Sequence, residues 1–202
     1  MRAYYESFWE DAPGDPEPWA WERRRALLLG EARRGERVLD LGCGAGRFVA
    51  ALRDAGADAV GVELAEAALS RARVNAPGAD LRLVEPDGSL PLEHGSVDLV
   101  WCSEVLEHVP DTAHLLLEVR RVLRTGGRLL VTVPYHGRVK NVLIALLRFD
   151  AHVDPLGQHV RFYTSGSLRT TLERSGFAAV QIEPWGGPPL LRTGLTARAL
   201  RA

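Results

Sequence analysis

Lysine and cysteine are both scarce in this chain of 202 residues. The cysteine shortage limits the kinds of disulfide and metal site that the protein can contain. Lys140 is the only lysine, so nearly every positive charge is an arginine, which reflects coding bias more than function. The two cysteines, Cys43 and Cys102, form no C-x-x-C pair and no zinc spacing. We expect reduced thiols that fill apolar space, with no disulfide framework and no cysteine zinc site.

The chain also lacks a large net charge and long hydrophobic runs. A formal charge of −1 argues against a protein dedicated to wrapping nucleic acid. No apolar stretch approaches membrane-spanning length, and the polar, aromatic N-terminus has no apolar core of a signal peptide. These absences predict a cytoplasmic protein that binds no nucleic acid and has no membrane span. The oligomeric state has no signal in the sequence.

The most informative stretch is residues 38–48, VLDLGCGAGRF. An apolar run ends at three glycines separated by single residues, Gly42, Gly44 and Gly46, and helical periodicity resumes directly afterwards. Glycine suits a tight turn there because it tolerates positive φ and lets a ligand approach the bare backbone. We interpret the stretch as a buried strand, a glycine turn and a helix N-terminus, whose free N–H groups add a polar surface.

The spacing of the glycines indicates what the loop binds. A dinucleotide fingerprint is G-x-G-x-x-G, but here Arg47 stands where its third glycine belongs. Asp40 lies two residues before the first glycine, where a carboxylate can face the loop. The resulting pattern, D-x-G-x-G-x-G, therefore argues against a nicotinamide cofactor.

Strands and helices alternate along the chain, which is typical of repeated βαβ units. With 46% hydrophobic and 25% charged residues, the composition is that of one ordinary globular domain. We predict an α/β fold, Rossmann-like and doubly wound, with a mostly parallel seven-stranded sheet and helices on both faces. The predicted strands are residues 38–41, 59–63, 81–84, 97–102, 128–134 and 177–183, with 190–202 as a final edge strand. The predicted helices are residues 19–32, 47–55, 64–74, 112–123, 136–149 and 167–175, the first with Trp21 and Leu28 inward and Arg23, Arg24 and Arg25 exposed.

The unusual residues gather where these strands end. Right-handed crossovers place the carboxyl ends of parallel strands on one edge of the sheet, and ligands bind there, at the switch point beside the first strand. The glycine loop, Glu63, Asp87 and the segment 103–108 all fall at this edge. Their agreement indicates one site more strongly than any single motif does.

These stretches together resemble class I S-adenosylmethionine-dependent methyltransferases, and in particular the small-molecule enzymes of the quinone-biosynthesis type. The matching stretches are VLDLGCGAGRF, the acid Glu63, DGSLPLEHGSVDLVWCSEVLEHVPD and RRVLRTGGRLLVTVP, within residues 37–134, and later HVRFYTSGSLRTTLERSGF. The resemblance implies one methyltransferase domain over residues 1–202. Its parts would be an N-terminal lid and helix (1–36), a cofactor-binding core (37–134), a substrate-side insert (135–165) and a C-terminal helix and strands (166–202).

The resemblance also implies S-adenosylmethionine as cofactor. The loop backbone would hold its methionine part, and Asp40 would orient the loop or meet the ammonium group. Glu63 would accept hydrogen bonds from the ribose hydroxyls, as acids about 20 residues beyond a glycine loop do. The full set expected to bind the cofactor is Asp40, Gly42, Cys43, Gly44, Gly46, Glu63, Leu64, Asp87, Gly88, Ser103 and Glu104.

Asp87 is the expected partner of the adenine amino group, although the chain departs here from the family pattern. Pro86, not Asp87, stands at the usual acid position when Leu90 and Pro91 are matched. Glu85 is the alternative partner. Gly88 would present its backbone to the adenine ring.

Histidines supply the candidate catalytic groups. His108 follows the fourth strand, and its imidazole can take a proton near neutral pH; a packing role is the alternative. His136 lies where the substrate segment of the family begins. His152, Asp154 and His159 could in principle bind a metal, but their loose spacing leads us to expect none.

We therefore expect methyl transfer to a small-molecule acceptor, with O-methylation ahead of N- or C-methylation. Tyr4, Tyr5, Phe8 and Trp9 could form a short lid helix over the site, and a loosely packed arm is the alternative. Two other classes stay open: a nicotinamide-dependent oxidoreductase, which shares the sheet, and a non-catalytic cofactor-binding protein, which keeps the glycine loop.

Overall fold

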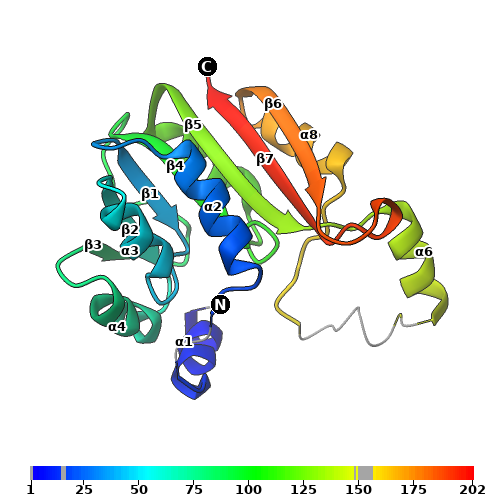
Figure 1. Cartoon of the computed structure of the whole chain (residues 1–202), viewed down its shortest axis with the longest axis horizontal. Helices are drawn as coiled ribbons and strands as arrows, with labels where there is room; N and C mark the ends of the chain where they lie inside the picture. The colour runs from blue at the N-terminus through cyan, green and yellow to red at the C-terminus, as the bar shows by residue number, and fades with distance from the viewer. Residues whose placement is uncertain (1, 15–16, 148, 150–156) are drawn as a thin grey trace.

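The chain folds around a seven-stranded sheet with the order β3-β2-β1-β4-β5-β7-β6 (Figure 1). The computed structural model describes residues 2–14, 17–147, 149 and 157–202. The strands are β1 (Arg37–Leu41), β2 (Asp58–Glu63), β3 (Asp80–Leu83), β4 (Val97–Ser103), β5 (Leu123–Pro134), β6 (Phe177–Trp185) and β7 (Gly194–Arg201). The helices are α1 (Arg2–Asp11), α2 (Trp21–Glu31), α3 (Arg47–Asp54), α4 (Glu66–Asn75), α5 (Thr112–Val122), α6 (Arg138–Leu147), α8 (Ser165–Arg174) and the 3₁₀ helix η1 (Pro189–Leu191).

Helices cover both faces of the sheet, as the alternating pattern predicts. On one face α2, α3 and α4 bury Leu28, Leu52 and Leu69 against Val38 of β1. On the other face α5 packs against β5 and α8 packs against β6 and β7, in the core cluster that also buries Leu39 of β1. Asp111 caps α5 by accepting a hydrogen bond from the backbone N–H of His114 at 2.9 Å. The doubly wound, mostly parallel sheet is thus confirmed.

The strand order reverses between β1 and β4, which pair with each other in parallel. Leu41 of β1 is in register with Val62 of β2 and with Cys102 of β4. The residues that follow each of these, Gly42, Glu63 and Ser103, therefore meet at one point on the carboxyl edge. This is the switch point at which ligands bind in open α/β sheets.

The C-terminal strand is not at the edge of the sheet, contrary to our expectation. β7 lies between β5 and β6 and pairs antiparallel with both. Its Leu195, Ala197 and Ala199 are buried, as a strand with two neighbours requires. β5 also begins earlier than predicted, at Leu123, because that residue still pairs with Val97 before the register shifts.

Helix α2 corrects a second expectation. Arg24 is buried, with 4% of its surface exposed, whereas Arg23 and Arg25 are exposed as predicted. Residues four apart lie on the same face of a helix, and Arg24 stands four residues before the buried Leu28. The helical spacing therefore turns this one arginine toward the sheet.

The predicted N-terminal helix exists as α1, which lies across the carboxyl ends of the first strands (Figure 1). Arg2 donates to the backbone oxygens of Leu64 at 3.2 Å and Val84 at 2.6 Å. Cys43 and Cys102 are buried and form no disulfide. Within the described residues, every helix is too short or too polar to cross a membrane.

Candidate active site at the carboxyl edge of the sheet

The glycine loop is built by three left-handed residues with different neighbours. Gly42, Gly44 and Gly46 have φ of 73°, 51° and 78°. A Cβ on Gly42 would lie 2.6 Å from the side chain of Val105, and one on Gly46 would lie 2.9 Å from Ala72 of α4. These two glycines let the loop pack closely against its surroundings.

Gly44 differs because, among the described residues, a Cβ there would meet only the N-terminal helix. A Cβ there would lie 3.0 Å from the indole ring of Trp9 and would meet nothing else within 4 Å. The backbone of Gly44 therefore faces a surface that only α1 covers. Gly44 is the position in the loop where a ligand can approach the bare backbone.

Glu63, at the end of β2, is fastened to this loop. Its Oε2 accepts a hydrogen bond from the N–H of Gly44 at 3.0 Å, and its Oε1 accepts from Leu64 at 2.7 Å and Ala65 at 3.3 Å. Burial raises the pKa of Glu63, and these backbone donors oppose that rise. The carboxylate thus links the ends of β1 and β2 at the switch point.

Asp40 lies beneath the loop on β1, with 1% of its surface exposed. Among the described residues, none donates a hydrogen bond to its Oδ2. Burial, with the nearby charge of Glu63, raises the pKa of Asp40 to about 8, while Arg24 opposes the rise. Asp40 is therefore an acid that holds its proton near neutral pH until a cationic group approaches.

Asp87 and its alternative Glu85 are both exposed on the loop after β3. Asp87 Oδ1 accepts a hydrogen bond from the N–H of Ser89 at 2.9 Å, and Glu85 forms an ion pair with Arg2 at 3.4 Å. Gly88 has a left-handed φ of 85°. The roles of Asp87 and Gly88 toward adenine stay predictions.

Ser103 and Glu104 belong to a buried chain of hydrogen bonds that begins at Arg24. Arg24 donates to Ser103 Oγ at 2.8 Å, and Thr132 donates to Glu104 Oε1 at 2.9 Å. The two hydroxyls are 2.7 Å apart, and because Thr132 donates onward, Ser103 must donate to Thr132. Glu104 has a left-handed φ of 55°, a strained conformation of the kind that clusters at functional sites.

Glu107 is the second acid of this turn and is 1% exposed. Burial, followed by the neighbouring charge of Glu104, raises the pKa of Glu107 to about 9. Burial likewise raises the pKa of Glu104, against the opposing charge of Arg24. Two carboxyl groups therefore share one buried site with one guanidinium.

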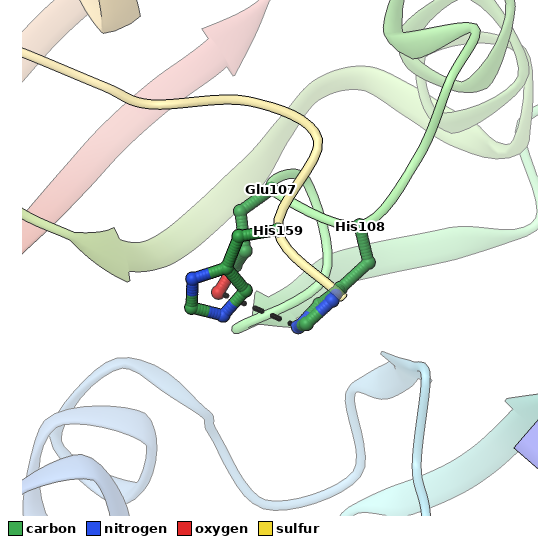
Figure 2. A group of neighbouring side chains, drawn as sticks. All are labelled: Glu107, His108 and His159. Atoms are coloured by element: carbon green, nitrogen blue, oxygen red, sulfur yellow. Dashed lines mark ion pairs between the residues drawn. The ribbon is translucent and has the colours of Figure 1, made fainter. Parts of the chain in front are cut away.

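His108 and His159 complete a cluster with Glu107 (Figure 2). His108 Nε2 lies 3.8 Å from Glu107 Oε1, and the two imidazole rings contact each other at 4.8 Å between centroids. Burial lowers the pKa of His108. Glu107 and His108 come from the turn after β4, and His159 comes from the segment before α8, so the cluster joins the core to the predicted insert.

Tyr5 of α1 lies between this cluster and Glu63 at the end of β2. Its ring packs edge-on against His108, 6.1 Å between centroids. Burial raises the pKa of Tyr5 to about 12, and the charges of Glu63 and Glu107 add to the rise. The phenol thus lies within the field of both acids.

The other predicted catalytic histidine, His136, lies elsewhere. It is buried, and its ring packs against Phe162 at 4.8 Å between centroids. It is not part of the cluster that the described residues form around His108. His152 and Asp154 of the metal hypothesis lie outside the described residues, and His159 instead joins Glu107.

Three participants of the site were missed in the sequence. Arg24 had a signal in its helical spacing to Leu28, and Glu107 had one in its position three residues after Glu104 and next to His108. Thr132 sits in an apolar strand and shows its role only through the pairing of β4 with β5, which aligns it with Ser103.

Comparison with known proteins decides the family. A model described as a methyltransferase domain matches residues 9–182 of the chain. The chain belongs to this methyltransferase family. The resemblance seen in the sequence is confirmed, and S-adenosylmethionine is the cofactor of the class.

Relatives of this methyltransferase include enzymes and solved structures. A ubiquinone biosynthesis O-methyltransferase of Thiobacillus denitrificans is 28% identical over 85% of this chain and 75% of that protein. A probable S-adenosylmethionine-dependent methyltransferase of Mycolicibacterium smegmatis is 33% identical over 82% of this chain and 62% of that protein. The crystal structure of an S-adenosylmethionine-dependent methyltransferase from Mesorhizobium loti is 25% identical with a TM-score of 0.71, covering 91% of this chain and 98% of that one. The chain spans less than two thirds of the length of some curated relatives.

The site of this methyltransferase fits the cofactor of its class. The cofactor carries a cationic ammonium group, and Asp40 offers a buried carboxyl oxygen without a donor among the described residues. The bare backbone of Gly44 faces the indole of Trp9 on α1, which would give way to a ligand there. This fit, with the family match, favours methyl transfer over the nicotinamide alternative.

Proposed function

We propose that the protein transfers the methyl group of S-adenosylmethionine to a hydroxyl group of a small-molecule acceptor. The observation that carries the choice of hydroxyl is the cluster of Glu107, His108 and His159 beside the cofactor edge. The names of the ubiquinone biosynthesis O-methyltransferases among the relatives support the same choice.

The cofactor would be held along the switch point. In this proposal the backbone around Gly44 binds the methionine part, Asp40 meets its ammonium group and Glu63 accepts from the ribose hydroxyls. Leu64 holds Glu63 in place through its N–H, and Asp87 with Gly88 borders the adenine. Ser103 and Glu104, at the end of β4, would line the cofactor on the other side of the switch point.

The bound cofactor supplies an activated methyl group on a sulfonium. The protein aligns the acceptor oxygen with the methyl–sulfur bond and excludes water, which is a matter of proximity and orientation. In this proposal the acceptor oxygen would take the methyl group, the electrons of the broken carbon–sulfur bond would stay on sulfur, and S-adenosylhomocysteine would be released. The acceptor proton must go to a base or to solvent.

The need to remove that proton distinguishes hydroxyl acceptors from amines. A neutral amine already has a free electron pair, whereas a hydroxyl becomes a strong nucleophile only as its proton leaves. Burial lowers the pKa of His108, so its ring is neutral near pH 7 and suited to this task. The acceptor therefore approaches from the side of His108.

The test is turnover on matched acceptor panels. Purified protein is given S-adenosylmethionine with phenols, aliphatic alcohols, amines and carboxylic acids of similar size, and methylated products are identified by mass spectrometry. The proposal expects O-methylated products. Methylation of amines or carbon alone would contradict it, and cofactor binding without turnover on any acceptor would favour the non-catalytic binding protein.

A further inference from the structure

The cluster of Glu107, His108 and His159 offers three metal-binding donors at one point. One carboxylate oxygen and one nitrogen from each ring all lie within 4.8 Å of one another (Figure 2). Two imidazoles and one carboxylate are a donor set that zinc uses in catalytic sites, where a fourth position stays open. The arrangement is formed by residues 52 positions apart at its extremes, from Glu107 to His159.

Backbone hydrogen bonds hold the two halves of the cluster together. The carbonyl oxygen of Glu107 accepts from the N–H groups of Val160 at 2.9 Å and Arg161 at 3.1 Å. His108 Nδ1 lies 3.0 Å from the carbonyl oxygen of Gln158. His159 lies in the chain between Gln158 and Val160, so these backbone hydrogen bonds place its side chain beside Glu107 independently of any ligand.

The bond from His108 Nδ1 also orients its ring. With Nδ1–H donating to the Gln158 carbonyl, the electron pair of Nε2 is directed away from it, toward Glu107 at 3.8 Å. Metal-bound histidines usually donate their second ring N–H to a carbonyl or carboxylate in this way. The contact therefore prepares Nε2 as a ligand.

Glu107 is a buried acid whose carboxyl oxygens can still bind a cation. Its side chain is 1% exposed, and no lysine, arginine or ordered hydroxyl among the described residues forms a hydrogen bond with either carboxyl oxygen; its hydrogen-bonding neighbour is a second acid, Glu104. A buried carboxyl group either keeps its proton or ionises when it pairs with a cation or coordinates a metal. Glu107 is thus a second, independent observation in favour of a cation at this cluster.

We propose that Glu107, His108 and His159 bind one divalent transition-metal ion, with zinc as the best match to the donors. Zinc bonds of about 2.0–2.2 Å in a tetrahedron place the ligand atoms about 3.4 Å apart. The donors need only a small closure from their present spacing, and the exposed side chain of His159 can supply it by rotation.

This inference rests on the proposed function, because the ion would lie on the acceptor side of the cofactor edge. A metal ion lowers the pKa of a coordinated hydroxyl. In the metal-bound protein the acceptor hydroxyl would release its proton to solvent and His108 would be a ligand, whereas in the metal-free protein His108 would take that proton itself. A hydroxyl with a neighbouring oxygen that can also bind the metal would be the preferred acceptor.

The experiment measures metal binding without turnover. Protein freed of metal by a chelator is titrated with Zn²⁺ by calorimetry, and with Co²⁺ while the visible d–d absorption is recorded. We expect one ion per chain in the wild type and an affinity lower by more than about 100-fold in Glu107→Gln and His159→Ala. His94→Ala removes an exposed histidine that precedes β4, at the opposite end of this strand from Glu107 and His108, and should leave the affinity unchanged.

The outcomes separate this inference from the proposed function. Absence of stoichiometric binding, or equal affinity in wild type and His159→Ala, would overturn the metal site, whatever the turnover assay shows. Because the side chain of His159 is exposed, this variant should fold even if Glu107→Gln does not, which circular dichroism verifies. Cofactor binding, measured separately with S-adenosylhomocysteine, should persist in the chelated protein.

Discussion

The guanidinium of Arg24 donates a hydrogen bond to Ser103 Oγ at 2.8 Å, although 79 residues separate the two in the chain. A second bond, from Arg24 Nε to the carbonyl oxygen of Trp19 at 2.7 Å, fixes the other side of the group. The charge of this buried arginine acts on Asp40, Glu104 and Glu107. One cation thus neutralises part of an acidic site that the cofactor and acceptor would enter.

The first prediction concerns that arginine. Arg24→Met keeps the length of the side chain but removes its charge and both hydrogen bonds, so it should lower the free energy of unfolding by about 1.5–3 kcal/mol. Urea denaturation measures the loss. Arg25→Met, on the exposed face of the same helix, should change stability by less than about 0.5 kcal/mol. Equal effects of the two changes would contradict the buried role of Arg24.

A second prediction tests the ribose contact. Glu63→Gln retains the shape of the side chain but removes its charge, and it should weaken S-adenosylhomocysteine binding by about 1–3 kcal/mol, as for a lost hydrogen bond to a charged group. Calorimetry measures the affinity. Glu66→Gln changes an acid three residues further on that pairs with Arg73, and it should bind as the wild type does. Unchanged affinity in Glu63→Gln, with the fold intact, would refute the contact.

A third prediction separates ligand approach from turn geometry at Gly44. Gly44→Ala and Gly35→Ala both place a side chain at positive φ, 51° and 79°, so each should cost about 1–2 kcal/mol of stability. In the part of the chain that the structure describes, no atom lies within 4 Å of a Cβ at Gly35, which precedes the amino end of β1. Only Gly44→Ala should also lose tenfold or more in cofactor affinity. A matched loss of affinity in both variants would make the glycine structural alone.

The sequence predicts the core of this fold and most of the edge because local signals coincide there. Apolar runs, glycine turns and acids at strand ends occur within a few residues of one another, and parallel crossovers bring them to one side. Glu63 was found because its place follows from a single strand end. The contacts confirm that it meets the loop at Gly44 N–H.

The parts that the sequence did not predict depend on contacts between distant segments. Thr132 lies next to Ser103 only because β4 pairs with β5. His159 lies beside Glu107 because the N–H of the next residue, Val160, donates to the carbonyl oxygen of Glu107. β7 was assigned to the edge because a strand pattern does not say which strands flank it. Arg24 is different, since its spacing to Leu28 was visible and its charge led us to place it outside.

A fourth prediction follows from the pKa of about 8 that burial gives Asp40. In the unliganded protein this acid is protonated below pH 8, and a bound ammonium group would stabilise its ionised form. Binding should therefore release a proton, and the Kd for S-adenosylhomocysteine should fall by up to tenfold per pH unit as pH rises toward 8, then level off. Titrations at pH 6, 7 and 8 measure this.

Asp40→Asn mimics the protonated acid, so it shows how much of the pH dependence of binding comes from Asp40. The variant should bind as the wild type does at pH 6 and about tenfold or more weakly at pH 8, whereas Asp54→Asn, exposed on α3, should keep the wild-type profile. The same raised pKa makes the stability of the free protein depend on pH. The unfolded chain releases this proton near pH 4, so the contribution of Asp40 to stability is present below about pH 4 and is lost as pH rises through about 8.

The last prediction concerns α1 as a lid over the site. Glu6 accepts hydrogen bonds from the N–H groups of Glu66 at 2.7 Å and Ala67 at 2.9 Å, at the start of α4. Arg71 of the same helix donates to the carbonyl oxygen of Trp9 at 2.6 Å. These contacts hold the indole of Trp9 against Gly44, where our proposal places the cofactor, so α1 would have to move for cofactor exchange.

Hydrogen exchange with and without S-adenosylhomocysteine tests this motion. Amides of α1 and of residues 157–164 should exchange quickly in the free protein and gain protection when the ligand is bound, because a methyl transfer site needs a second wall to exclude water. Glu6→Gln weakens the hydrogen bonds that hold α1 against the start of α4, so it should speed exchange in α1. Glu10→Gln, exposed on the same helix, should not. Protection confined to the glycine loop, Glu63, Asp87 and residues 103–108 would count against a lid, and the acceptor would then approach an open face.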